Sequence, residues 1–239
     1  PSSRFWFCLN GVAWYLSVQA FLYAIFPWLL AVLKKADTRR LRCIAAAIFC
    51  AQFLFSLAIW KAGLSGKSIF YLTYLCPLFR AGDFAISCCM GCLYHSRKEE
   101  RIPHGAFSLL ELAAVLFSGG CFFIAARQVG ALGAVAFRYN VLFTPSAVLL
   151  VWLLAVGKGV ISRLLSAKPF LWLAGLSPYG FLIHQVLIRY MELAANKLGL
   201  TTHPVVWTLT VFLLTLCLSS FYKALERRVR GRHGKAAAR

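Results

Sequence analysis

The feature that most constrains the fold is a series of long apolar runs separated by charged loops. A helix needs about 20 mostly apolar residues to cross the hydrocarbon core of a bilayer. The chain of 239 residues is 61% hydrophobic and 14% charged, whereas a soluble domain carries about 25% charged residues. Seven runs are long enough: about 12–33, 41–60, 74–94, 106–126, 138–157, 171–195 and 205–223. The sequence therefore predicts an all-α fold, a polytopic transmembrane helical bundle.

The positive charges indicate how such a bundle lies in a membrane. The formal net charge is +19, but the Lys and Arg residues fall between the apolar runs, which argues against a nucleic-acid-binding protein. Of the 26 Lys and Arg residues, 18 lie in the segments 34–42, 97–101, 158–168 and 223–239. Cytoplasmic loops carry such an excess. We expect a membrane domain over residues 1–225 and a basic cytoplasmic tail over residues 226–239.

The number of runs leaves two interpretations of the N-terminus. With the C-terminus in the cytoplasm, seven spans place Pro1 outside the cell, which is the topology of a seven-helix receptor. The chain begins with Pro1 rather than Met, and the first apolar run follows almost at once. An odd number of preceding helices would return the true N-terminus to the cytoplasm. We therefore expect the chain to be a fragment of a longer protein.

Two pairs of charged residues lie within the runs, where ionisable groups are costly and therefore candidates for function. Arg80 precedes Asp83 by three positions, which places both on one helix face, and Arg189 precedes Glu192 by the same spacing. By the orientation above, both pairs lie in the outer half of the bundle. Each pair either contacts a hydrophilic substrate that approaches from outside or only forms an ion pair that fixes a helix end.

Three other polar residues also have two interpretations each. Gln19 lies about two turns into the first run, and Arg138 opens the fifth run from outside, where it contacts substrate or extends its charge to the interface. His184 lies near the middle of the sixth run. A histidine there is a general base or a buried side chain that bonds a neighbouring helix. No acid or nucleophile accompanies it at a recognisable spacing, which favours the structural role.

The fourth apolar run contains a carboxylate. The end of the third contains cysteine and histidine, which are residue types that can bind metal ions. Glu111 lies near the cytoplasmic end of its run, so we expect its carboxylate to reach water. Cys89, Cys92 and His95 have metal-like spacing. No second ligand pair accompanies them, so the sequence predicts no metal site.

Four segments carry a more specific pattern than composition does. They are Asn10–Pro27, Pro77–Phe84 followed by Gly91, Lys168–His184, and Tyr222–Arg228. Trp14 and Gln19 belong to the first segment, and Arg80 and Asp83 belong to the second. The order and spacing of the four segments resemble those of the acyltransferase family 3 membrane proteins, and together they cover nearly the whole chain. Proteins of that family move acyl groups, usually acetyl, onto surface carbohydrates.

The chain departs from the family pattern at several places. The family often has Glu where this chain has Gln19, and a neutral amide can hydrogen bond but cannot act as a base. Ala174 replaces the usual Leu before a glycine, and Pro178 is inserted beside Ser177. The family's catalytic elements, an Arg followed by a His in its first helices, are not present in this chain. His184 matches a late family histidine that is not the usual catalytic candidate, so the catalytic residue is unknown and His184 is a weak candidate.

The resemblance implies an enzyme, a membrane O-acyltransferase and most often an O-acetyltransferase. It would take an acyl group from a cytoplasmic acyl-CoA donor such as acetyl-CoA, without a bound cofactor, and deliver it to a hydroxyl of an extracytoplasmic carbohydrate or glycolipid. Similar proteins have about ten helices, so seven spans here leave an odd number, three, to precede Pro1. The expected partners are membrane lipid and those missing N-terminal helices, without which the fragment would be inactive. The expected location is a bacterial cytoplasmic membrane.

The residues expected to contact substrate are Trp14, Gln19, Arg80, Asp83, Arg138 and Arg189. Two other functions remain open. A transporter or flippase of lipid-linked sugars would need broken helices in matching halves of the chain, and the sequence shows no such pairing. A seven-helix receptor would need a start codon close upstream of Pro1.

Overall fold

The computed structural model describes residues 14–96, 104–127, 136–138, 140–199 and 203–236, and these form helices joined by turns. The helices are α1 (Trp14–Leu33), α2 (Thr38–Lys61), α3 (Gly66–Phe70), the π-helix η2 (Tyr71–Leu75), α4 (Pro77–Ser96), α5 (His104–Arg127), α7 (Thr144–Val156), α8 (Val160–Leu165), α9 (Lys168–Ala174), α10 (Ser177–Leu198) and α11 (Pro204–Ala236). The described residues include no strand. The all-α prediction is confirmed.

Each of the seven predicted apolar runs contains helix, but not every helix is long enough to cross a membrane. Five are long and apolar enough: α1, α2, the combined segment Gly66–Ser96, α5 and α11. A sixth span results if α9 and α10, which meet at an angle of 57°, are counted as one. The fifth run, 138–157, contains α7, whose 13 residues extend only about 20 Å. The helical part is short because residues 140–143 form a turn and α7 begins at Thr144.

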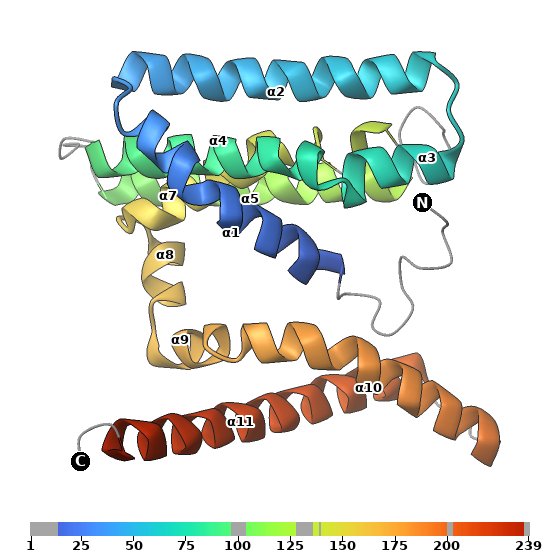
Figure 1. Cartoon of the computed structure of the whole chain (residues 1–239). Coiled ribbons are helices and arrows are strands. Elements are labelled where there is room, and N and C mark those ends of the chain that lie inside the picture. Colours follow the sequence, from blue (N-terminus) through green and yellow to red (C-terminus); the bar gives the residue numbers. More distant parts are fainter. Residues whose placement is uncertain (1–13, 97–103, 128–135, 139, 200–202, 237–239) are drawn as a thin grey trace. The chain divides into compact units, whose positions relative to one another are not determined.

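The chain forms two compact units, and the first consists of Tyr15–Leu165. Within it α2 packs along α4, while α1 crosses them obliquely (Figure 1). Leu33 of α1, Leu41 of α2 and Cys89 of α4 are buried together and join the three helices at one end. On the other side of this unit, Phe107 and Ala114 of α5 are buried against Leu153 of α7.

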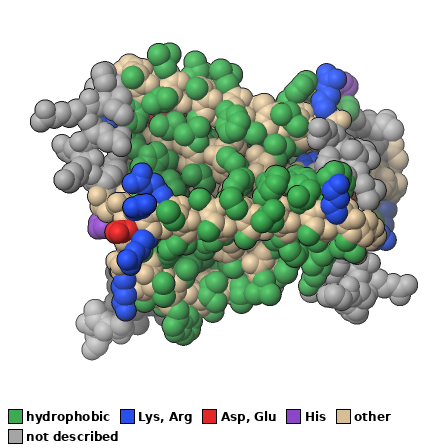
Figure 2. All heavy atoms as spheres, turned by 90° about the horizontal axis from the view of Figure 1, so that it is seen from above, with side chains coloured by type: hydrophobic (Ala, Val, Ile, Leu, Met, Phe, Trp, Pro, Cys, Tyr) green, Lys and Arg blue, Asp and Glu red, His purple; other side chains and the backbone are tan. Residues whose placement is uncertain are grey.

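The face that carries α2 has the charge distribution of a membrane segment. Figure 2 shows hydrophobic side chains across the middle of this face and Lys and Arg side chains toward its two ends. The sequence of α2 explains the pattern, because Arg39, Arg40 and Arg42 lie in its first turns and Lys61 is its last residue. Large apolar side chains such as Leu54 are exposed between them. Such a surface is favourable in lipid and costly in water.

The helix of the third span is interrupted near its start. This break leaves a backbone carbonyl available to accept a hydrogen bond from a side chain. Tyr71–Leu75 form a π-helix, Cys76 is extended with ψ of 118°, and α4 begins at Pro77. Proline is well suited to this first position, because it lacks the N–H that the first turn of a helix does not need. The extended backbone at Cys76 ends the helical hydrogen-bond ladder, so the Tyr74 carbonyl can accept from a side chain.

The second unit contains the described residues from Ser166 onward. Within it α10 packs against α11, and Gly180 lies close to Thr215 and Ser219, whose small side chains allow the two helices to approach. The helix α11 continues to Ala236, well past the predicted end of the last run at residue 223. Helix therefore includes most of the predicted basic tail.

Candidate functional site

The most elaborate polar cluster of the first unit is centred on the carboxylate of Asp83 in α4. Arg80 donates from an Nη atom to one carboxylate oxygen over 3.0 Å. Asn140, at the turn before α7, donates from Nδ2 to both oxygens, at 2.8 and 2.7 Å. Gln52 of α2 donates from Nε2 to the oxygen that Arg80 does not contact, over 3.1 Å. Three segments far apart in the sequence therefore converge on one carboxylate.

These contacts fill the acceptor capacity of Asp83. Each carboxylate oxygen accepts from two donors, and a carboxylate offers about four lone-pair sites in all. Arg80 neutralises the charge, and the two side chains are 18% and 29% exposed. A partly buried ion pair of this kind is tolerable only when its remaining polar atoms are bonded. The geometry therefore favours Asp83 as an anchor that positions its neighbours, rather than as a free base.

Arg80 is held at two points of its guanidinium. Besides the bond to Asp83, its Nε donates to the carbonyl of Tyr74 over 2.9 Å, and its charge lies 4.9 Å from the centre of the Tyr74 ring. The break at Cys76 makes that carbonyl available. Two of the five N–H donors of the guanidinium are thus engaged by the described residues, and three are not.

Gln52 joins α2 to α4 through a contact that only glycine permits. Its Nε2 donates to the carbonyl of Phe79 over 3.0 Å as well as to Asp83. A Cβ on Gly82 would lie 2.6 Å from this Nε2, so the absence of a side chain lets the amide lie against α4. Gln52 is 6% exposed, and its Oε1 has no hydrogen-bond partner in the part of the chain that the structure describes.

The amide of Asn140 is oriented by the first residue of α7. Thr144 donates from Oγ1 to Asn140 Oδ1 over 2.8 Å, which turns the amide nitrogen toward Asp83. Asn140 is 3% exposed. Asp83, Asn140 and Thr144 form a continuous hydrogen-bonded chain from α4 to α7.

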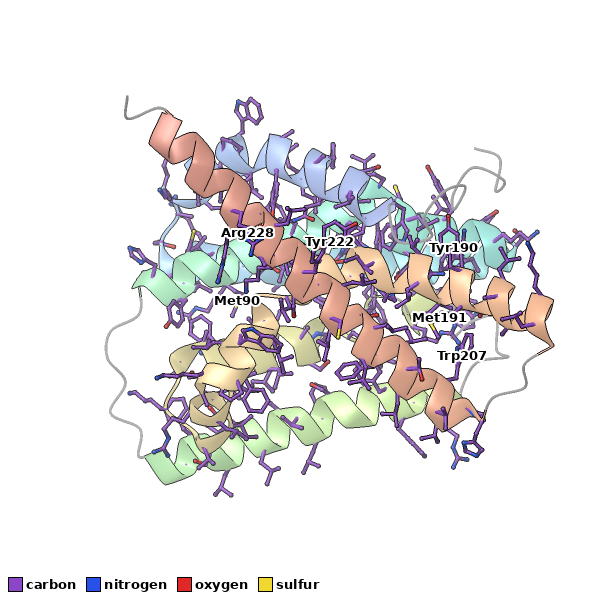
Figure 3. All side chains as sticks on the ribbon, turned by 90° about the horizontal axis from the view of Figure 1, so that it is seen from below. Met90, Tyr190, Met191, Trp207, Tyr222 and Arg228 are labelled. Atoms are coloured by element: carbon purple, nitrogen blue, oxygen red, sulfur yellow. The ribbon has the colours of Figure 1, made fainter. Side chains whose placement is uncertain are left out.

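This chain forms one end of a cavity of about 510 Å³ between α4 and α7. Its polar end contains Arg80, Asp83, Asn140 and Thr144. The rest of its lining is mostly apolar and includes Ile86, Met90, Phe143, Val148, Val151 and Trp152. Figure 3 labels Met90 on α4. Volumes of 300–1,000 Å³ are typical of small-molecule sites, and a few convergent polar groups in an apolar pocket are their usual chemistry.

A second cavity of about 510 Å³ lies between α1, α2 and α4. Lys34, Asp37 and His95 border it, and Cys92 is among its lining residues. Cys89 is instead fully buried against Leu33 and Leu41. Among the described residues, no group of three His, Cys, Asp or Glu side chains could hold a metal ion.

The structure brings together only two of the residues predicted to contact substrate. Arg80 and Asp83 pair with each other and line the cavity between α4 and α7. Gln19 instead donates to the hydroxyl of Tyr23 one turn along α1, over 2.6 Å. Trp14 is the first residue of α1 and is half-buried. Arg138 is half-buried and does not line this cavity.

The remaining candidates lie in the second unit. Arg189 is exposed on α10, and the described side chains of Arg189 and Glu192 form no ion pair, unlike Arg80 and Asp83. His184, also on α10, is half-buried, and its Nδ1 lies 3.0 Å from the carbonyl of Gly180 one turn earlier. The ring of Phe181 lies 6.0 Å away. Within the described residues, this histidine has no acidic partner. This absence favours a structural role over a role as general base.

Sequence reasoning missed Gln52 and the contact made by Asn140. Gln52 is an amide in the middle of the second apolar run, and a buried amide is costly unless it is hydrogen bonded. The position of Gln52 within an apolar run could therefore have indicated a buried hydrogen-bonded site. Asn140 lies beside Arg138 at the start of the fifth run, but its partner is 57 residues away, so the sequence did not reveal the pair.

The expectation for Glu111 was wrong. Its side chain is fully buried in α5, and its carboxylate accepts from the backbone N–H groups of Gly159, Ile161 and Ser162. These N–H groups lie at the start of α8 and have no helical acceptor of their own. Glu111 therefore contacts the start of α8 rather than water.

The sequence of this chain matches a known family, although it matches no individual curated protein. A comparison with curated proteins finds no match, and neither does a comparison with solved structures. The model of the acyltransferase 3 family, described as an acyltransferase domain, matches residues 1–223. The chain therefore belongs to the acyltransferase 3 family of integral membrane proteins, and this membership implies a transferase activity.

Proposed function

We propose that this chain is part of a membrane O-acyltransferase, in the first instance an O-acetyltransferase, that acylates a carbohydrate hydroxyl. The donor is a cytoplasmic acyl-CoA, and the acceptor lies on the other side of a bacterial cytoplasmic membrane. The observation that carries the proposal is the cavity between α4 and α7 with its bonded polar end, in a chain that matches an acyltransferase domain over residues 1–223.

The charge distribution supports an orientation for this cavity. The basic segment 97–101 follows α4, and Lys158 follows α7, so both helices end where the excess of positive charge lies. In the proposed orientation those ends, and the C-terminus, are cytoplasmic. The polar end of the cavity, at Arg80 and Asn140, then faces outward, where a carbohydrate approaches.

The reaction requires a base, an electrophile and positioning groups. The acceptor hydroxyl oxygen attacks the thioester carbonyl carbon while a base takes the hydroxyl proton, the carbon–sulfur bond breaks, and the base returns that proton to the sulfur, so that CoA leaves as the thiol. Asp83 is a poor candidate for that base because its oxygens are already occupied. We assign the base to helices that precede this chain in the complete protein, and to Arg80 and Asn140 the task of holding the acceptor.

The test uses the complete protein in proteoliposomes, with radiolabelled acetyl-CoA and carbohydrate acceptors. Arg80→Ala is expected to lower acyl transfer while the amount of protein in the membrane stays unchanged. The control is Arg39→Ala, which removes an exposed arginine from the first turn of α2 that is not among the expected substrate contacts. If Arg80→Ala reduces abundance and activity equally, the ion pair has only a structural role, and the assignment of Arg80 to the acceptor fails.

A transporter or flippase of lipid-linked sugars has support from one observation. Two apolar segments are broken: Gly66–Ser96 at Cys76, and the α9–α10 pair by a bend of 57°. Broken helices are typical of transporter binding sites. Movement of a fluorescent lipid-linked sugar across the proteoliposome membrane, with no acyl transfer, would favour this alternative.

A further inference from the structure

The cavity between α1, α2 and α4 has a volume of about 510 Å³ and has no part in the proposed reaction. Helix α1 contacts α4 at two levels. The ring of Phe26 packs edge-on to Phe84 with the centres 5.9 Å apart, and Leu33 is buried together with Cys89. Phe26, Leu30 and Leu33 all line the cavity. From Phe26 to Leu33 the helix rises about 10 Å at 1.5 Å per residue, so the wall formed by α1 has about this length.

The lining of this cavity changes from apolar to basic along the helices. Phe26 and Leu30 of α1 and Cys88 of α4 form apolar walls. Lys34, just after α1, and His95, near the end of α4, line the other end. A soluble ion would leave the apolar walls without contacts, whereas a molecule with a polar head and an apolar chain would contact both parts. Phe26 is 38% exposed, so such a chain can enter sideways from the bilayer.

The charge at the basic end determines which kind of head it would bind. The segment 34–42 contains five basic side chains and one acidic side chain, Asp37. The Asp37 carboxylate caps α2, where its Oδ1 accepts from the N–H of Arg40 over 2.7 Å. Lys34 is exposed and forms no ion pair with any residue that the structure describes. An anionic head therefore has a cationic partner here, and basic pockets between membrane helices are typical sites for anionic lipid head groups.

We propose that this cavity binds an anionic phospholipid, with the phosphate at Lys34 and His95 and one acyl chain between α1 and α4. In the orientation proposed above, the basic end lies on the cytoplasmic side, where the leaflet carries anionic lipids. The chain fills the space between the two contacts of α1 with α4. An unfilled apolar space would lose those van der Waals contacts, so the lipid holds α1 against α2 and α4. This binding does not depend on acyl transfer.

The test is native mass spectrometry of the complete protein in a neutral detergent. Phosphatidylglycerol and phosphatidylcholine with identical acyl chains are offered together, so that only the charge of the head differs. The protein is expected to retain phosphatidylglycerol in preference to phosphatidylcholine. Equal retention of the two lipids would overturn the proposal, because it would show lipid bound without regard to charge, or a cavity that other helices of the complete protein cover.

Two neighbouring lysines make the test specific for this cavity. Lys34→Ala removes the cation that lines it and is expected to lower the preference for phosphatidylglycerol about fivefold, the scale for one basic residue at an anionic head group. Lys35→Ala removes an exposed lysine that does not line the cavity, and the preference should change by less than about twofold. Equal effects of the two changes would overturn the proposal, because they would show attraction to the basic segment as a whole.

A second pair of variants tests the apolar part of the cavity. Leu30→Trp adds bulk to a half-buried lining residue and is expected to lower the binding of phosphatidylglycerol about tenfold, the scale on which a changed apolar pocket discriminates ligands. Val32→Trp adds bulk to a residue that is 66% exposed and does not line the cavity, so binding should remain near the original. Unchanged binding in Leu30→Trp would place the acyl chain elsewhere and overturn the proposal.

The competing occupant is an acyl-CoA, which also carries phosphate groups. Acetyl-CoA added to the protein is expected to leave the bound phosphatidylglycerol in place. Displacement of the lipid by acetyl-CoA would assign the cavity to the donor and overturn the lipid site. The inference and the proposed function can fail separately. Lys34-dependent retention of phosphatidylglycerol by a protein that transfers no acyl group would support the lipid site and reject the enzyme, and acyl transfer without lipid preference would do the reverse.

Discussion

Two carboxylates of the first unit, Asp83 and Glu111, differ in what holds them. Glu111 is fully buried and bound by three backbone N–H groups at the start of α8. Asp83 is 29% exposed and bound by the side chains of Arg80, Asn140 and Gln52 beside a cavity. Backbone donors are fixed by the fold, whereas side-chain donors can be exchanged or can turn toward a ligand.

The comparison suggests how structural and functional carboxylates can be separated within a helical membrane protein. Glu111 has partners that no substrate could displace without unfolding α8, and a Cβ on Gly159 would overlap its carboxylate. Asp83 has partners that also line a cavity of about 510 Å³. We therefore expect changes at Glu111 to act on stability first and changes at Asp83 to act on activity first.

The largest expected effect is that of Glu111→Ala on stability. It leaves without acceptors the N–H groups of Ile161 and Ser162 in α8 and of Gly159 just before it, and each buried unsatisfied group costs about 1–3 kcal/mol. We expect the free energy of unfolding to fall by at least about 3 kcal/mol, measured by thermal unfolding in detergent. Gly159→Ala should also destabilise, because its Cβ would enter the space of the Glu111 carboxylate.

The control for Glu111 is Glu192→Ala, which removes an exposed carboxylate of α10 and should change the unfolding temperature little. A stable Glu111→Ala protein with lost transferase activity would reverse the comparison, because Glu111 would then belong to the functional machinery.

The next effect is that of Asp83→Asn on activity. The change removes the negative charge that pairs with Arg80 and places an amide against the Asn140 amide. We expect transfer to fall by about 100-fold, the loss that misplaced positioning groups produce, with a smaller loss of stability than for Glu111→Ala. The measurement pairs acetyl transfer in proteoliposomes with thermal unfolding of the same preparation.

The exchange Asp83→Asn with Asn140→Asp sharpens this prediction. It keeps one carboxylate and one amide in the contact, so the double variant should recover part of the activity lost by Asp83→Asn. Additive losses would show that the position of the charge, and not the pairing, is what the site requires.

Particular residues show which parts of this arrangement the sequence could predict. The pairing of Arg80 with Asp83 was predictable because both lie on one turn of α4, and the all-α class followed from the apolar runs. The contacts of Asp83 with Gln52 and Asn140 join residues 31 and 57 positions apart. They depend on how α2, α4 and α7 pack, which apolar periodicity does not encode. The burial of Glu111 was missed for the same reason, since its partners lie about 50 residues away.

Arg80→Lys should have an intermediate effect. One ammonium cannot reproduce the fork in which Nε bonds the Tyr74 carbonyl and an Nη atom bonds Asp83. The charge remains, so we expect stability close to the original and a loss of transfer of about tenfold, between the original protein and Arg80→Ala. Full activity in Arg80→Lys would show that charge alone is needed at the polar end of the cavity.

The smallest expected effect is that of Gly82→Ala, and it tests whether Gln52 positions the Asp83 cluster. The added Cβ would lie 2.6 Å from Gln52 Nε2, so the amide must shift away from Asp83. Alanine gains about 1 kcal/mol of helix propensity over glycine, which offsets much of the lost hydrogen bonding. We therefore expect an unfolding temperature near the original and a several-fold loss of transfer. Gly120→Ala is the matched control, because nothing lies within 4 Å of its Cβ position on α5. If the Gly82→Ala and Gly120→Ala proteins transfer acyl groups equally well, Gln52 only packs α2 against α4. Arg80 and Asn140 would then be the only partners of Asp83, among the three described above, that distinguish it functionally from Glu111.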